Sequence, residues 1–317
     1  MKNILFTRKL IKTSEESALN FFKVKFNIND ILLSKAEIIN QSNDCDGIIS
    51  SITEVFDEDL ISKLSNKIKI ISNFGVGFSN IDIEAAKKRN IVVTNTPNVL
   101  TAATAEIAIL IILGAARRAT EGIKYARSKK WKWSSNFLIG KELNQARLGI
   151  LGMGRVGRAV ANRARSFGMK IHYYNRVRLS PNLENKSIYH NNIKSLFSVS
   201  DFLSINCTST EETKHIINKK TLSYFPYGAV IANSARGEMI EDDSMIKALK
   251  SGKIFSLGLD VYNGEPNIHP EYLTLSNVFV LPHLGSATYK TRKAMSDLAI
   301  NNLREFFENG NCKNTVN

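Results

Sequence analysis

Short apolar runs alternate with helical patterns along nearly the whole chain, which is typical of βαβ units and of parallel sheets. In the first third of the sequence, apolar runs predict four strands, at residues 4–6, 47–50, 68–73 and 91–94. Between the last two, the stretch IDIEAAKKRN predicts a helix that ends at Asn90 as a left-handed cap. The tail NGNCKNTVN, residues 309–317, predicts a frayed end.

A second series of apolar runs begins near the middle of the chain. It predicts six strands, at residues 148–151, 170–174, 201–205, 229–233, 256–260 and 278–281. Strands of this number with helices between them suit a doubly wound dinucleotide-binding domain. We therefore predict an α/β protein with two doubly wound parallel-sheet domains.

The connection between the two series contains the most apolar stretch, AEIAILIILGAARR, residues 105–118. It is shorter than the ~18 residues that a membrane span needs, and Glu106 and Arg117 bound it. The pattern indicates a helix that is too apolar for a surface, so its burial must come from the domain junction or from another subunit. We expect the helix 102–116 to pack at a two-fold interface of a homodimer.

Composition narrows the classes of function. The chain has 43 basic and 29 acidic residues, a net charge of +14, but its Lys and Arg residues are scattered and no zinc-finger or RNA-binding motif accompanies them. This favours a solvated basic surface that attracts small anions over a nucleic-acid binder. Three cysteines without ligand-like spacing argue against a disulfide framework and a metal site, and they fit a reducing cytoplasm. The start of the chain, MKNILFTRKLIK, lacks the apolar core of a secretory signal.

The stretch GILGMGRVG, residues 149–157, has the G-x-G-x-x-G spacing between a predicted strand and a predicted helix. Gly152 allows the tight turn, Gly154 lets backbone N–H groups approach a pyrophosphate, and Gly157 permits close packing of the helix on the sheet. This context predicts a dinucleotide site.

The residue type at the ribose end of this site bears on the cofactor. An Asp or Glu is expected ~20 residues after the loop, where it binds the ribose hydroxyls. Here the stretch HYYNRVR places Asn175 there, followed by Arg176 and Arg178. An uncharged residue does not repel a 2′-phosphate, and arginine can bind one, so the sequence favours NADP(H) over NAD(H). The alternative is that these are solvent-facing residues of an NAD enzyme.

Three later segments each consist of an apolar strand that ends in polar residues, at the sheet edge where such folds bind ligands. AVIANSARGE brings Arg236, LGLDVYNGEP brings Asp260 and Glu265, and VFVLPHLGSAT brings His283.

Taken together, these motifs resemble the D-isomer-specific 2-hydroxyacid dehydrogenases. The resemblance covers nearly the whole chain and includes NFGVGFSNID, VVTNTPNVLT, ILGMGRVG, NSARGE, GLDVYNGEP and PHLGSAT in the family's order. Within the family, NSARG beside YYNRVR looks most like the glyoxylate/hydroxypyruvate reductases. The resemblance implies a Rossmann NAD(P)-binding domain at 99–286 and a flavodoxin-like substrate domain at 1–98, completed by 287–317.

The resemblance also implies roles in the reduction of a small 2-oxo acid. His283 would donate the proton, and Glu265 would hold the other ring nitrogen and favour the imidazolium. Arg236 would bind the substrate's carboxylate together with backbone N–H groups around Val76 and Gly77.

For the cofactor, the resemblance adds residues beyond the glycine loop. Asp260 would contact the carboxamide end of the nicotinamide, and Cys207 and Ser234 would line its cleft. The full predicted set is Thr104, Gly152, Gly154, Arg155, Val156, Gly157, Asn175, Arg176, Cys207, Ser234, Ala235 and Asp260. One departure is Thr208, where many members have a proline, and it puts only the local shape of a cofactor loop in doubt.

Two other functions stay open on the sequence. A D-3-phosphoglycerate or D-lactate type dehydrogenase would share the catalytic residues and differ in its substrate pocket. A non-catalytic NAD-sensing protein, similar to a corepressor of this fold, belongs to another class, and the intact Arg–Glu–His set weighs against it. Trp131 and Trp133 have two interpretations: they reach a neighbouring subunit's pocket, or they serve packing alone. His172, His190, His215 and His269 match no motif and are predicted to be structural or exposed.

Overall fold

Two separate parallel sheets organise the chain, and the computed structural model describes residues 1–317. Unit 1 consists of Met1–Leu100 together with Ala287–Asn317, and unit 2 consists of Thr101–Ser286.

The sheet of unit 1 has five strands in the order β2-β1-β3-β4-β5, and all neighbouring strands are parallel. Its strands are β1 (Lys2–Phe6), β2 (Phe22–Phe26), β3 (Gly47–Ser51), β4 (Ile70–Phe74) and β5 (Val92–Thr94).

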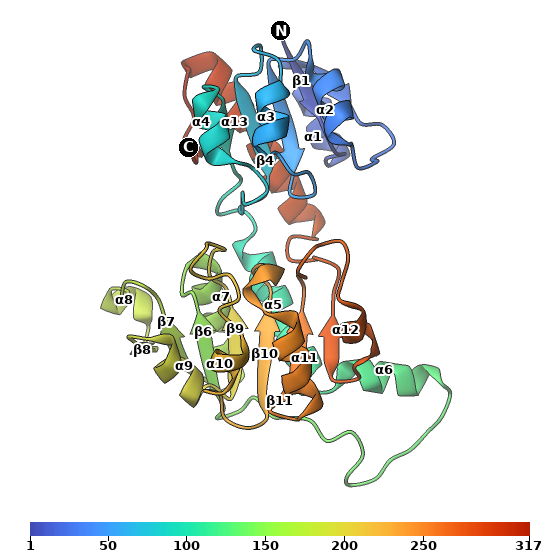
Figure 1. Ribbon diagram of the computed structural model, residues 1–317, viewed down its shortest axis with the longest axis vertical. Helices are drawn as coiled ribbons and strands as arrows, with labels where there is room; N and C mark the ends of the chain where they lie inside the picture. The colour runs from blue at the N-terminus through green and yellow to red at the C-terminus, as the bar shows by residue number, and fades with distance from the viewer. The chain divides into compact units, whose positions relative to one another are not determined.

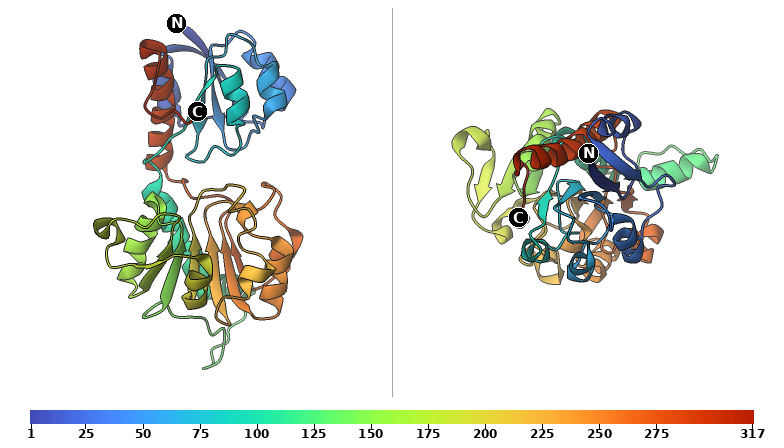
Figure 2. Two further views of the ribbon diagram at one scale, coloured as in Figure 1. Left: turned by 60° about the vertical axis from the view of Figure 1, so that its left-hand side comes forward. Right: turned by 90° about the horizontal axis from the view of Figure 1, so that it is seen from above.

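Helices cover both faces of this sheet because side chains alternate between its faces along each strand. Leu5 and Ile48 pack under α2 (Lys35–Ser42), α3 (Glu58–Lys63) and α4 (Ile83–Lys88). Ile4 and Ile49 pack under α1 (Lys12–Ala18) and α13 (Tyr289–Asn309). Figure 1 and Figure 2 show α13, the C-terminal helix, running alongside the strands of this unit.

The sheet of unit 2 has seven parallel strands in the order β12-β11-β10-β9-β6-β7-β8. Its strands are β6 (Arg147–Leu151), β7 (Lys170–Tyr174), β8 (Ile188–His190), β9 (Phe202–Ile205), β10 (Ala229–Asn233), β11 (Ile254–Leu259) and β12 (Val278–Val280). The chain builds outward from β6 in one direction and then from β9 in the other. The carboxyl ends of β6 and β9 therefore flank a topological switch point, where folds of this kind bind ligands.

The helices of unit 2 also form two layers. The packed helices of one face are α5 (Thr101–Ala116) and α7 (Arg155–Ser166), and those of the other are α9 (Ile193–Val199), α10 (Lys219–Leu222) and α11 (Asp242–Lys250) (Figure 1). Shorter helices lie in the connections: α6 (Ala119–Arg127), α8 (Pro181–Glu184), α12 (Pro270–Thr274) and the 3-10 helix η1 (Gly237–Met239).

The predicted fold class is confirmed, and the prediction missed only the two edge strands β2 and β8. An edge strand presents its polar side chains to water, so its sequence has no continuous apolar run. β2 reads FKVKF, with both lysines exposed, and β8 has only three residues, none of them buried. Asn90 adopts the predicted left-handed conformation, with φ 53°.

The prediction of a frayed C-terminal tail is wrong. Thr315 forms an antiparallel bridge with Thr94, and the backbone N–H of Val316 donates to the carbonyl of Val93. The tail is thereby paired with β5, the edge strand of unit 1. An edge strand leaves backbone groups unpaired, and the tail satisfies them.

The expected source of burial for α5 is also wrong. Ala105, Ala108, Ile111 and Ile112 pack against the sheet of unit 2 and against α7, all within the same unit. The sheet lies beneath α5 and α7 beside it, so an apolar residue on either of these sides is covered without a domain junction or a second subunit. Leu110 is the exception, at 44% exposed. No helix in the structure combines the length and the apolar character that a membrane span requires.

Candidate active site

Three neighbouring strands of unit 2 deliver Arg236, Glu265 and His283 to one edge of the sheet. Each residue follows its strand, β10, β11 and β12, at the carboxyl end. Gly237 permits the close contact of two of these loops, because a Cβ atom there would collide with the backbone of Tyr262. The parallel sheet thus brings together residues that lie far apart in the sequence.

His283 and Glu265 form a direct pair, with 2.7 Å between Nδ1 of the imidazole and Oε2 of the carboxylate. The imidazole Nε2 makes no hydrogen bond within the protein and is left for a ligand. The backbone N–H of Tyr262 donates to Oε1 of Glu265 over 2.9 Å, so both carboxylate oxygens are held. Burial raises the pKa of Glu265, but its hydrogen bond to His283 and the charge of that ring outweigh burial and leave the pKa below its usual value.

The backbone of His283 adopts a left-handed conformation, with φ 54°. This conformation is unfavourable for residues with a side chain, so surrounding contacts must hold it. The N–H groups of Leu284 and Gly285 donate to the carboxylate of Asp260 over 2.7 and 2.9 Å, and that of His283 donates to the Asp260 carbonyl over 2.9 Å. The hydroxyl of Thr104 donates to the Gly285 carbonyl over 3.2 Å. The imidazole is therefore presented by a fixed loop.

Arg236 lies on a turn that Asn233 clamps from within. The Asn233 side chain donates to the Arg236 carbonyl over 2.8 Å and accepts from the Ala235 N–H over 3.0 Å. The guanidinium donates to the Ala235 carbonyl over 2.7 Å and forms no ion pair. Burial lowers the pKa of Arg236, while the charges of Glu265 and Glu238 act in the opposite direction. A partly buried cation without a carboxylate partner is suited to bind an anionic ligand.

The three glycines of the phosphate loop have different surroundings. A Cβ atom at Gly152, which has φ 95°, would collide with the backbone of Cys207, and one at Gly157 would collide with the carbonyl of Gly152. At Gly154, by contrast, no atom lies within 4 Å of the Cβ position, and no side chain caps the helix α7 that begins there. An uncapped helix N-terminus beside open space fits the diphosphate of a dinucleotide.

At the ribose end, the two arginines differ in their availability. Oδ1 of Asn175 accepts from the N–H of Met153 over 2.7 Å, while its amide N–H₂ group has no partner. Arg178 is committed to a bidentate pair with Glu184, at 2.8 and 3.1 Å. Arg176 is free of such a partner: its side chain is 80% exposed, and Glu212 lies 3.8 Å away. Of the two, Arg176 is therefore the one able to meet a phosphate.

Several other predicted cofactor residues lie on the same edge of this sheet. Cys207 lies beside Met239, with 3.6 Å between the sulfur atoms, and burial raises its pKa to about 11, so it is a thiol. Asp260 is 1% exposed, and its clamp on the His283 loop is a role that the sequence did not reveal. Burial raises the pKa of Asp260, against the lowering effect of these hydrogen bonds.

The predicted substrate residues Val76 and Gly77 belong to unit 1, in the loop after β4. The carbonyls of the GVG stretch, residues 75–77, all accept hydrogen bonds from within the unit: in chain order, from Thr96 N (2.9 Å), Asn95 Nδ2 (2.8 Å) and Asn73 Nδ2 (2.9 Å). The N–H groups of Val76 and Gly77 make no hydrogen bond within the protein. They form a pair of backbone donors of the kind that binds carboxylates.

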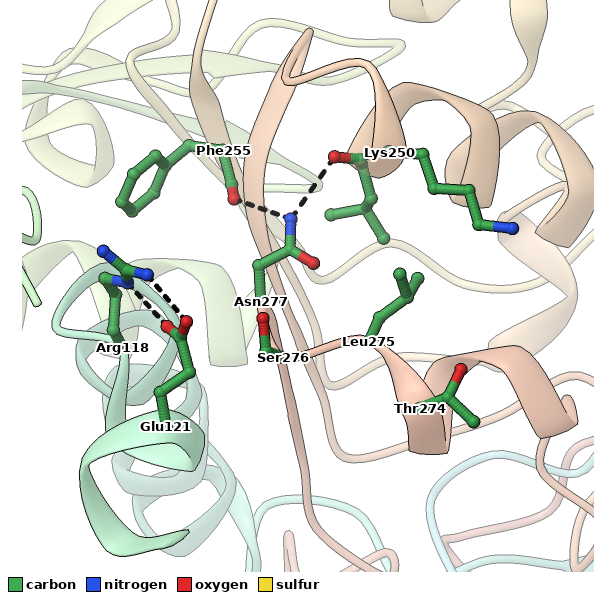
Figure 3. A pocket seen from close by; sticks show the side chains of 9 residues that line it. Arg118, Glu121, Lys250, Phe255, Thr274, Leu275, Ser276 and Asn277 are labelled. Carbon is green, nitrogen blue, oxygen red and sulfur yellow. Dashed lines mark hydrogen bonds and ion pairs between the residues drawn. The ribbon is translucent and has the colours of Figure 1, made fainter. Parts of the chain in front are cut away.

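A pocket of about 450 Å³ lies elsewhere in unit 2, at the amino-terminal ends of β11 and β12 (Figure 3). Arg118 and Glu121 pair with each other in its wall, and Asn277 donates to the carbonyls of Phe255 and Leu249. None of the predicted site residues lines this pocket, so it is separate from the chemistry described above.

Sequence reasoning missed residues that position the site rather than form it. Asn233 and Tyr262 lie inside motifs that were identified, but only the structure shows their bonds. The hydroxyl of Tyr262 donates to the carbonyl of Leu281, two residues before His283. Tyr262 thus holds Glu265 through its backbone and the histidine loop through its side chain.

Comparisons with known proteins agree with this geometry. The model of the D-isomer specific 2-hydroxyacid dehydrogenase NAD-binding domain matches residues 109–285. A glycerate dehydrogenase from Hyphomicrobium methylovorum is 38% identical over 301 residues, which cover 94% of this chain and 94% of that protein. A glyoxylate reductase from Thermococcus litoralis is 36% identical over 319 residues, with 99% and 96% covered.

Among solved structures, the NADPH-dependent glyoxylate/hydroxypyruvate reductase from Sinorhizobium meliloti, in complex with NADP and malonate, is 30% identical. It covers 99% of this chain and 96% of its own, with a TM-score of 0.89. The matched domain contains the phosphate loop and all three strand-end residues, and the relatives align over nearly the full length. The chain therefore belongs to the D-isomer-specific 2-hydroxyacid dehydrogenase family.

Proposed function

We propose that the protein reduces a small 2-oxo acid of the glyoxylate or hydroxypyruvate type to the D-2-hydroxy acid. The observation that carries this proposal is an arginine without an ion pair, Arg236, on the same sheet edge as the paired His283 and Glu265. A 2-oxo acid requires a cation for its carboxylate and a proton donor for its carbonyl oxygen, and this site contains one of each.

The roles of the residues follow from their contacts. Arg236 binds the carboxylate and polarises the adjacent carbonyl, and the N–H groups of Val76 and Gly77 donate to the same carboxylate. Glu265 orients His283 through Nδ1, so that Nε2 gives its proton to the carbonyl oxygen of the substrate. The bound dinucleotide supplies the hydride for C2.

The two units divide the work in this proposal. Unit 2 binds the cofactor, with Gly154, Arg155 and Val156 at the diphosphate, and unit 1 contributes substrate contacts. The proposed domains are 99–286 for the cofactor, and 1–98 with 287–317 for the substrate. Asn175 and the exposed Arg176 support NADP(H) as the preferred cofactor.

Turnover with different acids tests the proposed function. Purified protein is expected to oxidise NADPH with glyoxylate and with hydroxypyruvate at a higher kcat/KM than with pyruvate or 3-phosphohydroxypyruvate. A preference for either of the last two would favour the D-lactate or D-3-phosphoglycerate type of dehydrogenase. Cofactor binding without turnover of any of these acids would instead favour an NAD-sensing protein.

Replacing Glu265 with Gln is expected to move the high-pH decline of reductive kcat to lower pH by about one unit or more. Reduction needs the protonated imidazole, and the ionised Glu265 stabilises that form. Without the anion, the proton is lost at lower pH. The pH dependence of kcat measures this, with Glu271→Gln as the matched control, because Glu271 is an exposed carboxylate paired with Lys250. An unchanged decline in Glu265→Gln would contradict the assigned pair.

A homodimer is a further part of the proposal. Helix α6 has no buried residue, and Trp131 and Trp133 in the following segment are 88% and 81% exposed. Apolar side chains so uncovered support a second subunit as their partner. Light scattering at micromolar concentration is expected to give twice the mass of one chain, and a monomer would count against the dimer. The three cysteines are free, which supports a reducing compartment such as the cytoplasm.

A further inference from the structure

The C-terminal tail is fastened to β5 by side chains as well as by backbone pairing. The Asn317 side chain accepts from the N–H of Val93 over 2.8 Å and donates to the carbonyl of Ile91 over 2.7 Å. The N–H of Asn95 donates to the carbonyl of Asn314 over 3.2 Å. The pairing therefore continues past the end of the strand, to the segment that precedes Thr96.

Three asparagines close a ring of hydrogen bonds at this point. Asn314 Nδ2 donates to Asn302 Oδ1 over 2.8 Å, and Asn302 Nδ2 donates to the carbonyl of Asn95 over 2.9 Å. The bond from Asn95 N to the Asn314 carbonyl completes the ring. Asn302 lies on α13 and is 1% exposed, so its amide has no water to replace these partners. The ring fixes the backbone of Asn95 to both α13 and the tail.

The Asn95–Thr96 segment in turn orients two N–H groups of the GVG loop. In a trans peptide unit, the C=O of one residue and the N–H of the next point in opposite directions. Asn95 Nδ2 binds the carbonyl of Val76, which fixes the direction of the Gly77 N–H. Thr96 N binds the carbonyl of Gly75, which fixes the direction of the Val76 N–H.

From these contacts we propose that the tail, residues 311–317, positions the substrate's carboxylate cradle through the ring of Asn314, Asn302 and Asn95. This inference rests on the proposed function of Val76 and Gly77 as carboxylate donors. Asn95, Asn302 and Asn314 are positioning residues, since none of them needs to touch the substrate. The tail acts on the affinity for the acid and leaves cofactor binding, which belongs to unit 2, unaffected.

The test compares two asparagine-to-alanine variants of the same tail. Asn314→Ala removes one bond of the ring, whereas Asn311→Ala is the control, because Asn311 is exposed and makes no side-chain hydrogen bond. Asn314→Ala is expected to raise the KM for glyoxylate and the inhibition constant of oxalate by about fivefold, the effect of one net hydrogen bond. The kcat and the KM for NADPH should stay within about twofold of the wild type, below the effect of one such bond.

A double-mutant cycle separates positioning from general loosening of the fold. Asn95→Ala is expected to raise the KM for glyoxylate further, because it deletes the bond to the Val76 carbonyl. In the Asn95→Ala background, the effect of Asn314→Ala should shrink, since the two residues act on the same loop. If Asn95→Ala fails to fold, deletion of 311–317 replaces it and should reproduce the rise in KM at unchanged KM for NADPH.

The outcomes distinguish the inference from the proposed function. A wild type that reduces no 2-oxo acid overturns the proposed function, and the inference falls with it. An active wild type whose glyoxylate KM is the same in Asn314→Ala and Asn311→Ala overturns the inference alone. A parallel rise in the KM for NADPH would also overturn it, because the tail would then act on the whole protein.

Discussion

Replacing His283 with Ala is expected to lower kcat for 2-oxo acid reduction by at least about 10², the usual contribution of a general acid. The imidazole is the only group of the site that the structure holds by one nitrogen, against Glu265, while leaving the other nitrogen free. Binding of NADPH should change little, since the phosphate loop lies after a different strand. Steady-state kinetics and fluorescence titration with NADPH measure the two quantities.

A second variant separates the loss of the proton donor from a loss of loop structure. His283 has φ 54°, a conformation that asparagine tolerates better than other residues with a side chain. His283→Asn should therefore keep the loop on Asp260 and still lose kcat to the same extent as His283→Ala. Near-normal turnover in His283→Asn would remove His283 from the proton transfer.

The central strands could be predicted from the sequence because parallel strands in the middle of a sheet are buried on both faces. β7 and β10 begin and end at the predicted residues, and every residue of β10 is buried. Tertiary context decides the rest. The tail looks polar and unstructured by composition, and only the exposed edge of β5 gives it a partner.

The candidate site divides along the same line. Arg236, Glu265 and His283 could be proposed because each follows an apolar strand, and the carboxyl ends of parallel strands share one edge. Hydrogen bonds between residues distant in the sequence could not, because asparagine has no pattern that names its partner. The ring of Asn95, Asn302 and Asn314 is one such case. Arg178 is another, since its pairing with Glu184 rather than with a ligand depends on the fold of α8.

The other large effect is expected at the ribose end of the cofactor site. Arg176→Ala should weaken NADPH by about 1.5–3 kcal/mol, the contribution of a charge-assisted hydrogen bond, and should barely alter NADH. Asn175→Asp should reduce the kcat/KM for NADPH further, because it puts a negative charge where the 2′-phosphate binds. The same variant should improve NADH, since the carboxylate accepts from both ribose hydroxyls. Its Oδ1 can still accept from the N–H of Met153, so the loop keeps its shape.

Arg178→Ala is the matched control for these variants, because Arg178 is bound to Glu184 at 2.8 and 3.1 Å. It should leave the ratio of kcat/KM for NADPH over NADH unchanged. Equal losses for both cofactors in Arg176→Ala would show that this arginine supports the fold and not the phosphate. A wild type that prefers NADH would show that an uncharged residue at Asn175 carries no selectivity, because the repulsion it avoids would then have no ligand to act on.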